Sequence, residues 1–344
     1  MMNTLFKRII NYSLVFINST ALNAQLKWTN VDSLYQPLPP SVHVYFTNEP
    51  IDTAPFQAYY LIADLKDKKI NFTADTTLGR RLTPTQFYQK NDQPLVVVNC
   101  TFFSFATNQN LNVVIKDGKM VGYNIHTIAG RGKDTLTYRH PTGSALGVSK
   151  NRKADIAWLF ADTAMKYPVA FETNPELLKD SNSWVSKFSF APELHHLPKL
   201  EKRRGIKDRW KMKTAVGGGP ILLQNGEIRI TNNEELKFAG KAINDKHPRT
   251  AMGYTKDGKL IILMIEGRNA VAHGATLVQE AQILKDLSCW EALNLDGGGS
   301  SCMLVNGKET IKTSDKEGQR PVPAVFMIRK KLKRKMIFIF RLII

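Results

Sequence analysis

Four tight-turn signals constrain the fold of this chain more than any other feature. Asp-Gly occurs at 117–118 and 257–258, and Asn-Gly occurs at 225–226 and 306–307. Both pairs tolerate the positive φ angles of short hairpin turns, and each lies between segments rich in β-forming residues. The pattern therefore predicts a chain dominated by β-hairpins.

The remaining periodicity indicates buried strands and one helix. Apolar runs at 95–98 and 260–265 are typical of strands that are buried on both faces. Thr276 and Gln279 have the spacing of a helix-capping box. An apolar helical stripe follows the cap, made of Leu277, Val278, Ala281, Leu284 and Leu287. We expect an α+β fold with mixed β-sheets built from hairpins, few helices and a single large catalytic-type domain.

The domain is expected to span residues 25–328, with an insertion or long connection at 151–213 over its face. The N-terminus has the order of a secretory signal peptide: Lys7 and Arg8, an apolar stretch at 9–17, then Ala24. Residues 1–24 are therefore predicted to be a signal peptide, which would export the protein to the periplasm, cell envelope or extracellular space. The alternative is a frayed N-terminal helix.

The net charge favours anionic partners. Lys and Arg number 48 against 30 Asp and Glu, which gives +18. Seven of these cations lie in the basic and apolar tail at 329–344, so the rest of the chain still carries +11. The apolar end of the tail is too short to span a bilayer, which needs about 20 residues. It could make peripheral contact with an anionic membrane, although a disordered extension is the favoured interpretation.

The sequence lacks the motifs of several classes of protein. The three cysteines include no CxxC pair and are too few for a disulfide scaffold. Neither a dinucleotide fingerprint nor a P-loop is present, and no known DNA- or RNA-binding motif accompanies the basic charge. We therefore assign no cofactor, no metal ligand and no nucleic-acid partner.

A glycine-rich segment at 294–301 is the strongest local signal for a functional site. Asp296 follows an apolar strand at 292–295 and precedes Gly297, Gly298 and Gly299. Successive glycines expose backbone N–H groups and permit close approach of a ligand. The structural alternative is a glycine turn that Asp296 caps through its side chain. A second triple glycine, at 217–219, opens the hairpin at 225–226.

Two further segments contain residues suited to binding an anion. Arg249 begins one strand, and Glu266 and Arg268 follow the end of the next. A guanidinium binds phosphate oxygens in pairs, so these arginines could hold a phosphate beside a carboxylate. A salt bridge between Glu266 and an arginine is the structural alternative. Asn99 ends another apolar strand and could bind a sugar hydroxyl. Cys100 would need a nearby base to act as a nucleophile, and this role is not favoured.

Taken in order, these segments resemble the phosphodiester glycosidase family. The resemblance covers roughly residues 90–328 and rests on the segments 96–103, 215–226, 247–268, 274–287, 292–307 and 320–323. The middle segment is unusually long for the family. The sequence also departs from the family at three places. Cys100-Thr101 replaces an Ala-Gly-like pair, Glu266 replaces an aspartate, and His273 replaces a small polar residue.

The resemblance implies hydrolysis of an α-glycosyl phosphodiester or phosphorylated glycan, with N-acetylglucosamine as the candidate sugar and a phosphomonoester as the other product. Asp296 or Glu266 would supply the catalytic carboxylate. Arg249, Arg268 and the N–H groups of the three glycines would bind the phosphate. Asn99, Thr276 and Ser300 would contact the sugar. The competing hypothesis is a non-catalytic protein on the same scaffold that binds carbohydrate or an envelope polymer.

Overall fold

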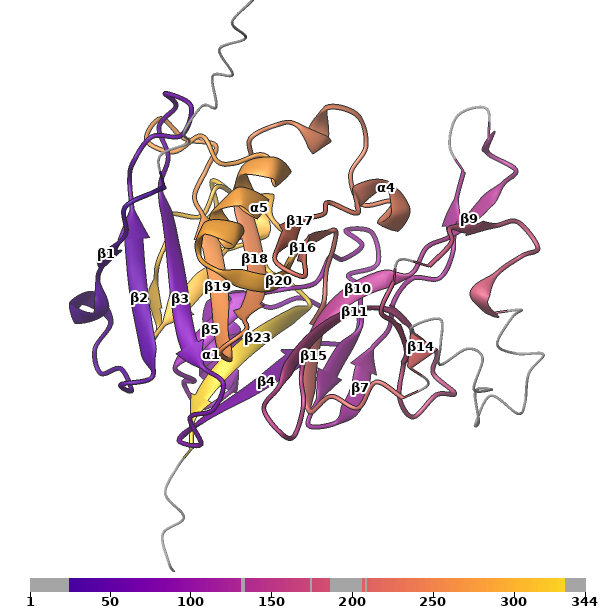
Figure 1. Cartoon of the computed structure of the whole chain (residues 1–344), viewed down its shortest axis with the longest axis horizontal. Helices are drawn as coiled ribbons and strands as arrows, with labels where there is room; N and C mark the ends of the chain where they lie inside the picture. The colour runs from indigo at the N-terminus through magenta and orange to yellow at the C-terminus, as the bar shows by residue number, and fades with distance from the viewer. Residues whose placement is uncertain (1–24, 131–133, 174, 186–205, 208, 332–344) are drawn as a thin grey trace, which may run out of the picture.

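The computed structural model describes residues 25–130, 134–173, 175–185, 206–207 and 209–331 (Figure 1). The signal peptide expected at 1–24 lies outside these residues, as does the tail beyond residue 331. In the described part of the chain, no helix is long and apolar enough to cross a membrane.

Antiparallel β-sheets dominate the described residues. The largest has eight strands, in the order β1 (Thr29–Asn30), β2 (Val42–Thr47), β3 (Ala58–Asp64), β19 (Lys259–Ile265), β18 (Arg249–Thr255), β20 (Cys289–Asn294), β16 (Ile221–Gln224) and β17 (Glu227–Ile228). The second has seven strands, in the order β14 (Ile206–Lys207), β12 (Val169–Phe171), β11 (Ala154–Phe160), β10 (Gly143–Val148), β15 (Thr214–Gly217), β6 (Val114–Lys116) and β7 (Lys119–Gly122).

Two smaller sheets complete the β-structure of the described residues. One has five strands, in the order β22 (Lys308–Glu309), β21 (Met303–Val305), β5 (Val96–Asn99), β23 (Ala324–Lys330) and β4 (Ile70–Thr76). The other has three, in the order β13 (Leu178–Lys179), β9 (Tyr138–His140) and β8 (Ile128–Ala129). Because β23 includes Arg329 and Lys330, the sheet extends into the segment that the sequence assigned to the tail.

The four predicted turns are confirmed. Three of them are two-residue hairpin turns in which both central residues have positive φ, such as Asn306 (49°) and Gly307 (79°) between β21 and β22. The expectation of mixed sheets was wrong, because every strand pair in the described residues is antiparallel. A hairpin connection can only join antiparallel neighbours, so the turn signals already favoured this outcome.

Helices are few in the described residues, as expected. They comprise α1 (Pro84–Lys90), α4 (Asn232–Glu235), α5 (Leu277–Asp286) and the 3₁₀ turns η1 (Asp32–Tyr35), η4 (Gly240–Ile243) and η5 (Gly298–Ser300). The capping box that begins α5 is present: Thr276 Oγ1 accepts from Gln279 N at 3.2 Å, and Gln279 Oε1 accepts from Thr276 N at 2.9 Å. The predicted stripe was wrong at Val278, which is exposed, and it missed Glu280, which is buried.

One hydrophobic cluster joins the eight-, seven- and five-stranded sheets, so they form a single domain. It includes Val44 of β2, Trp158 of β11 and Phe326 of β23. A second cluster lies between the eight-stranded sheet and α5, where Ala251 packs with Leu284. In Figure 1, α5 covers β16, β18 and β20.

The segment at 151–213 is more regular than the sequence indicated. Within it, residues 154–159 of β11 pair with β10, and β12 pairs with β11. Part of this segment is therefore an integral piece of the seven-stranded sheet and not a connection over the face of the domain. The apolar run of β11 at 156–160 is short and flanked by charged residues, so its strand character was not recognised in the sequence.

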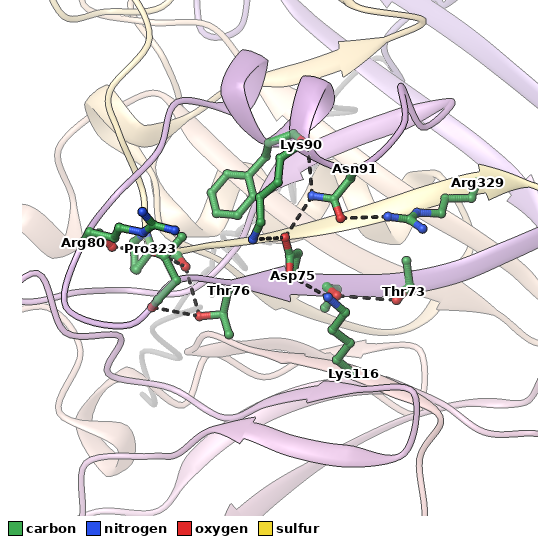
Figure 2. A network of polar contacts seen from close by, with 12 residues as sticks. Thr73, Asp75, Thr76, Arg80, Lys90, Asn91, Lys116, Pro323 and Arg329 are labelled. Carbon is green, nitrogen blue, oxygen red and sulfur yellow. Dashed lines mark hydrogen bonds and ion pairs between the residues drawn. The ribbon is translucent and has the colours of Figure 1, made fainter.

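A buried carboxylate links the five-stranded sheet to its neighbours (Figure 2). Asp75 of β4 accepts hydrogen bonds from Lys90 Nζ and Lys116 Nζ, both at 2.7 Å, and from Asn91 Nδ2 at 2.9 Å. Arg329 of β23 donates to the same asparagine at 2.7 Å. Burial opposes the charge on Asp75, but the bonds from the two lysines and the asparagine bring its pKa down to about 2. The network therefore ties β4 to α1 and β6.

We expect Asp75→Asn to reduce the free energy of unfolding at pH 7 by about 2 to 3 kcal/mol, the value that corresponds to a pKa lowered from 3.8 to about 2. A lowered pKa stabilises the fold above the unfolded value, so the difference from wild type should disappear as the pH falls from about 4 to 2. Urea unfolding across this range measures the effect. Asp92→Asn, on an exposed side chain nearby, is the matched control and should change little; equal losses in both variants would contradict the prediction.

Candidate active site

The ends of three neighbouring strands of the eight-stranded sheet, β19, β18 and β20, lie beside one another. The start of β18, at Arg249, lies opposite Ile265 at the end of β19. On its other side, Ala251 of β18 pairs with Asn294 at the end of β20. Glu266 follows the end of β19 directly, and Asp296 lies two residues after the end of β20. The segments that carry most of the predicted site residues therefore lie side by side.

Asn99 holds the Asp296 loop in place. Its Nδ2 donates to the Asp296 carbonyl at 2.6 Å, and its Oδ1 accepts from Thr250 Oγ1 at 3.0 Å and Cys302 N at 3.1 Å. The Asp296 N–H in turn donates to the Cys100 carbonyl at 2.8 Å. Asn99 is fully buried, and its amide is committed to the loop instead of to the sugar contact that the sequence predicted.

The pKa of the Asp296 carboxyl is high for an aspartate. Burial raises its pKa to about 7, although the Ser300 hydroxyl, the Arg320 charge and the Gly297 N–H all favour the ionised form. A carboxyl that titrates near neutral pH can accept or release a proton under ordinary conditions. These properties are typical of a catalytic acid or base.

Two of the three glycines allow an arginine side chain to approach the loop. A Cβ on Gly298, which has φ of +61°, would lie 3.1 Å from the Arg268 guanidinium, and a Cβ on Gly299 would collide with Arg320. The predicted role of the glycine N–H groups in binding phosphate is not supported for Gly298, because its N–H donates to the Pro248 carbonyl at 2.9 Å.

Arg268 is the best placed of the predicted arginines for contact with a ligand. Its side chain is exposed and lies over Gly298. Its Nη2 lies 3.4 Å from Nδ1 of His247, whose pKa is lowered by burial and by the charges of Arg249 and Arg268. A neutral imidazole beside an exposed guanidinium leaves a local positive charge that suits a phosphate.

Arg249 is buried and largely committed to the protein. Its Nε donates to the Ala275 carbonyl at 2.9 Å, and its Nη2 donates to the Asp245 carbonyl at 3.2 Å. Its guanidinium lies 5.5 Å from the ring centre of Phe238, and it is only 3% exposed. Arg249 therefore fixes the loops around the site, and the two-pronged phosphate contact that the sequence predicted is not available to it.

Glu266 is buried too, and both of its carboxylate oxygens have partners. One accepts from Asn269 Nδ2 and the other from the Lys312 N–H, each at 2.9 Å. These bonds join the end of β19 to the segment after β22, and neither partner is the arginine that a simple salt bridge would need. The geometry therefore favours Asp296 over Glu266 as the catalytic carboxylate.

The two predicted hydroxyl groups differ in their surroundings. Thr276 caps α5, so its oxygen already accepts a hydrogen bond. Ser300 is buried, and no hydrogen bond of good geometry holds its hydroxyl within the described residues, although it lies near the Asp296 carboxyl. Ser300 is thus the better candidate for contact with a ligand.

Sequence reasoning assigned no role to two residues near the site, Arg320 and Glu280. Arg320 donates to both carboxylate oxygens of Asp315, at 2.7 and 2.8 Å, and contacts the loop beside Gly299. Its signal was present, because residue 320 opens the last segment of the family resemblance. Glu280, behind Arg249, is fully buried. Only its position four residues after the cap of α5 could have revealed it.

Neither a metal-binding cluster nor a reactive thiol is found in the described residues. No three His, Cys, Asp or Glu side chains converge there in a way that could hold a metal ion. Cys100 is fully buried, and burial raises the pKa of its thiol to about 12. A thiol of that kind is not a nucleophile at neutral pH.

Residues 173–329 match the family model described as phosphodiester glycosidase. The SPbeta prophage-derived uncharacterized protein YomE of Bacillus subtilis (strain 168) is 40% identical over 73 residues, which are 21% of this chain and 11% of that protein. The N-acetylglucosamine-1-phosphodiester alpha-N-acetylglucosaminidase of Mus musculus is 30% identical over 108 residues, or 29% of this chain and 21% of that enzyme. The alignments thus span about a fifth or less of either relative's length.

The fold is also shared with a solved structure. The catalytic domain of the zebrafish N-acetylglucosamine-1-phosphodiester alpha-N-acetylglucosaminidase superposes with a TM-score of 0.56 and 19% identity, covering 90% of this chain and 89% of that one. At this identity the likeness concerns the fold. Together with the match of residues 173–329 to the family model and the ordered sequence motifs, the shared fold makes this chain similar to the phosphodiester glycosidase family.

Proposed function

We propose that this protein hydrolyses an α-glycosyl phosphodiester and releases a free sugar and a phosphomonoester, with N-acetylglucosamine as the first sugar to test. The observation that carries the proposal is the Asp296 carboxyl, whose pKa is raised to about 7 by burial beside Arg320 and the glycine loop. The family relationship supplies the reaction class.

In the proposed reaction, the bond between the anomeric carbon and the phosphate oxygen breaks. The phosphomonoester leaves with the electron pair of that bond, and the oxygen of water ends on the anomeric carbon. The ionised Asp296 accepts a proton from that water and then releases it to solvent. A phosphomonoester is a weak base, so its departure needs cationic neighbours more than a proton donor. Arg268, which is exposed beside Gly298, is placed to provide that charge.

The test is product analysis by NMR with a panel of α-glycosyl phosphodiesters that includes N-acetylglucosamine α-phosphate esters. In ¹⁸O-labelled water we expect the label in the sugar and not in the phosphate, because the carbon–oxygen bond breaks. Label in the phosphate would instead identify a phosphodiesterase, in which the water attacks the phosphorus atom. Saturable binding of the substrates without turnover would favour the carbohydrate-binding hypothesis.

The proposal extends to an extracytoplasmic location. It rests on the basic, apolar and small-residue order at 1–24. Mass spectrometry of the native protein should find a mature N-terminus near Gln25. A cytoplasmic protein that retains residue 1 would contradict it.

A further inference from the structure

A pocket of about 240 Å³ lies between α4 and the segment that follows β5. Most of its wall is apolar and comes from Phe102, Phe103, Leu111, Ile125, Ile128 and Leu236. In Figure 1, α4 lies above β10 and β16, and its Glu235 bonds to groups on both strands.

The acidic side chain in this lining has no spare bonding capacity. One oxygen of Glu235 accepts from Thr231 Oγ1 at 2.6 Å and from Ile221 N at 3.0 Å. The other accepts from the hydroxyl and the N–H of Ser144, at 2.7 and 3.2 Å. Glu235 therefore holds α4 to the sheets and offers no acceptor to a ligand.

The two amide side chains in the lining are similarly engaged. The Asn124 amide accepts from Val113 N at 2.9 Å and donates to the carbonyls of Gly143 and Leu159. The Asn112 amide accepts from Phe102 N at 3.0 Å and donates to the Gly218 carbonyl at 3.4 Å. A sugar placed here would bury hydroxyl groups with few partners, which costs about 1 to 3 kcal/mol for each unsatisfied group. The pocket is thus better suited to an apolar group.

Lys237 supplies a cation at the same pocket. Its ammonium lies 5.2 Å from the ring centre of Phe102. No ion pair or hydrogen bond to this ammonium is found in the described residues, and burial lowers its pKa while Glu235 opposes that shift. Its three donors are therefore available to an anionic ligand such as a phosphate.

Two backbone hydrogen bonds connect the surroundings of the pocket to the segment 294–296. A Cβ on Gly219 would lie 2.6 Å from Cε of Lys237, and the Gly219 N–H donates to the Asn294 carbonyl at 2.7 Å. On the other side, the Cys100 carbonyl accepts from Asp296 N, two residues before Phe102 in the chain. The pocket lining is thus linked to the Asp296 loop through residues 100–102 and through Gly219.

We propose that this pocket binds the aglycone of the substrate, and that the aglycone is an apolar group attached directly to the phosphate. Lys237 contacts the phosphate, and the apolar wall receives the carbon chain or ring. The inference rests on the proposed function, because it assigns one half of that substrate to this pocket. It predicts selectivity for the phosphate substituent that is independent of the sugar.

The test is calorimetric binding of two phosphomonoesters, hexyl phosphate and methyl phosphate, to the wild-type protein. Both resemble the proposed product, so binding is measured without turnover. We expect hexyl phosphate to bind at least about tenfold more tightly, because burial of each additional CH₂ group is favourable by up to about 0.8 kcal/mol. Equal affinities of the two esters would overturn the proposal, even if the glycosyl phosphodiesters are hydrolysed.

Three variants locate the effect. Ile125→Asn should reduce the preference for hexyl phosphate to less than about threefold, because a polar group then faces the chain. Val121→Asn is the matched control, on a side chain that is similarly exposed outside the pocket lining (40% against 38%). It should leave the preference intact. Lys237→Met should weaken the binding of both esters and leave the ratio of their affinities unchanged. A preference that survives Ile125→Asn would place the binding site elsewhere.

Discussion

Asp296→Asn is expected to lower turnover of an α-glycosyl phosphodiester at least about a hundredfold, which corresponds to about 2.7 kcal/mol of activation free energy. The substitution keeps the shape of the side chain but removes the negative charge that stabilises a cationic anomeric centre. The backbone bonds of the loop, from Asn99 and to the Cys100 carbonyl, do not involve the carboxyl. The fold should therefore be kept. The melting temperature at pH 7 should not fall, because the raised pKa of Asp296 means that its ionised form destabilises the native state above the ordinary pKa of 3.8. Turnover and melting temperature can be measured on the same sample.

The wild-type pH profile provides a second readout of the same carboxyl. If Asp296 acts as a base, it must be ionised, so kcat/KM should rise with pH and level off above about 7. A carboxylate with an ordinary pKa would give a rise near pH 4 instead. An acidic limb at that lower pH would contradict the assignment.

Glu266→Gln is the matched control for the catalytic assignment. Glu266 is buried, and it accepts bonds from Asn269 and the Lys312 N–H. Its amide variant would place an NH₂ group against one of these donors, so we expect a lower melting temperature with a smaller loss of turnover. Normal turnover in Asp296→Asn with a large loss in Glu266→Gln would reverse the assignment. Normal turnover in both variants would mean that neither carboxylate is catalytic and would favour the hypothesis of a binding protein.

The sequence predicts local structure well where a single residue type is physically required. Asn306 and Gly307 adopt positive φ in the turn that their types indicate. Thr276 and Gln279 form the capping box because both partners of that motif lie within one helical turn. The family segments also predicted that Arg249, Asp296 and Glu266 belong to one site, and all three lie near neighbouring strand ends of the eight-stranded sheet.

The partners of these side chains could not be predicted, because they come from distant segments. Arg249 bonds to the Ala275 carbonyl and Glu266 bonds to the Lys312 N–H, and no sequence pattern encodes either pairing. Asn99 was correctly placed at a strand end, yet its amide bonds to the loop and not to a ligand. The residues around the site were thus predictable, whereas the division between residues that bind substrate and residues that hold loops depended on tertiary contacts.

Glu280 shows the same limit and gives the largest expected effect on stability. It lies in the first turns of α5 with no exposed surface, and neither carboxylate oxygen has a hydrogen-bond partner in the described residues. Burial raises its pKa to about 8, and the nearby charge of Arg249 only partly opposes this shift. Glu280 is therefore protonated in the folded protein at neutral pH, although a glutamate in the unfolded chain is ionised.

We expect the free energy of unfolding to fall as the pH rises from about 5 to 9. The native state keeps a proton that the unfolded state releases above its ordinary pKa of 4.5, so stability is lost until the pH passes the folded value of about 8. Glu280→Gln replaces the protonated acid with a neutral group of the same shape and removes this penalty. The variant should match wild type near pH 5 and exceed it by up to about 5 kcal/mol at pH 9.

Denaturant unfolding at pH 5, 7 and 9 measures the difference, with Glu176→Gln as the control on an exposed glutamate. The control should follow the pH dependence of the wild type. If Glu280 were instead ionised and paired with Arg249, its removal would leave a buried guanidinium without its counter-charge. Glu280→Gln would then be less stable than wild type at all three pH values, because one partner of a buried ion pair had been lost. The sign of the change at pH 9 therefore decides between a neutral Glu280 and an ion pair.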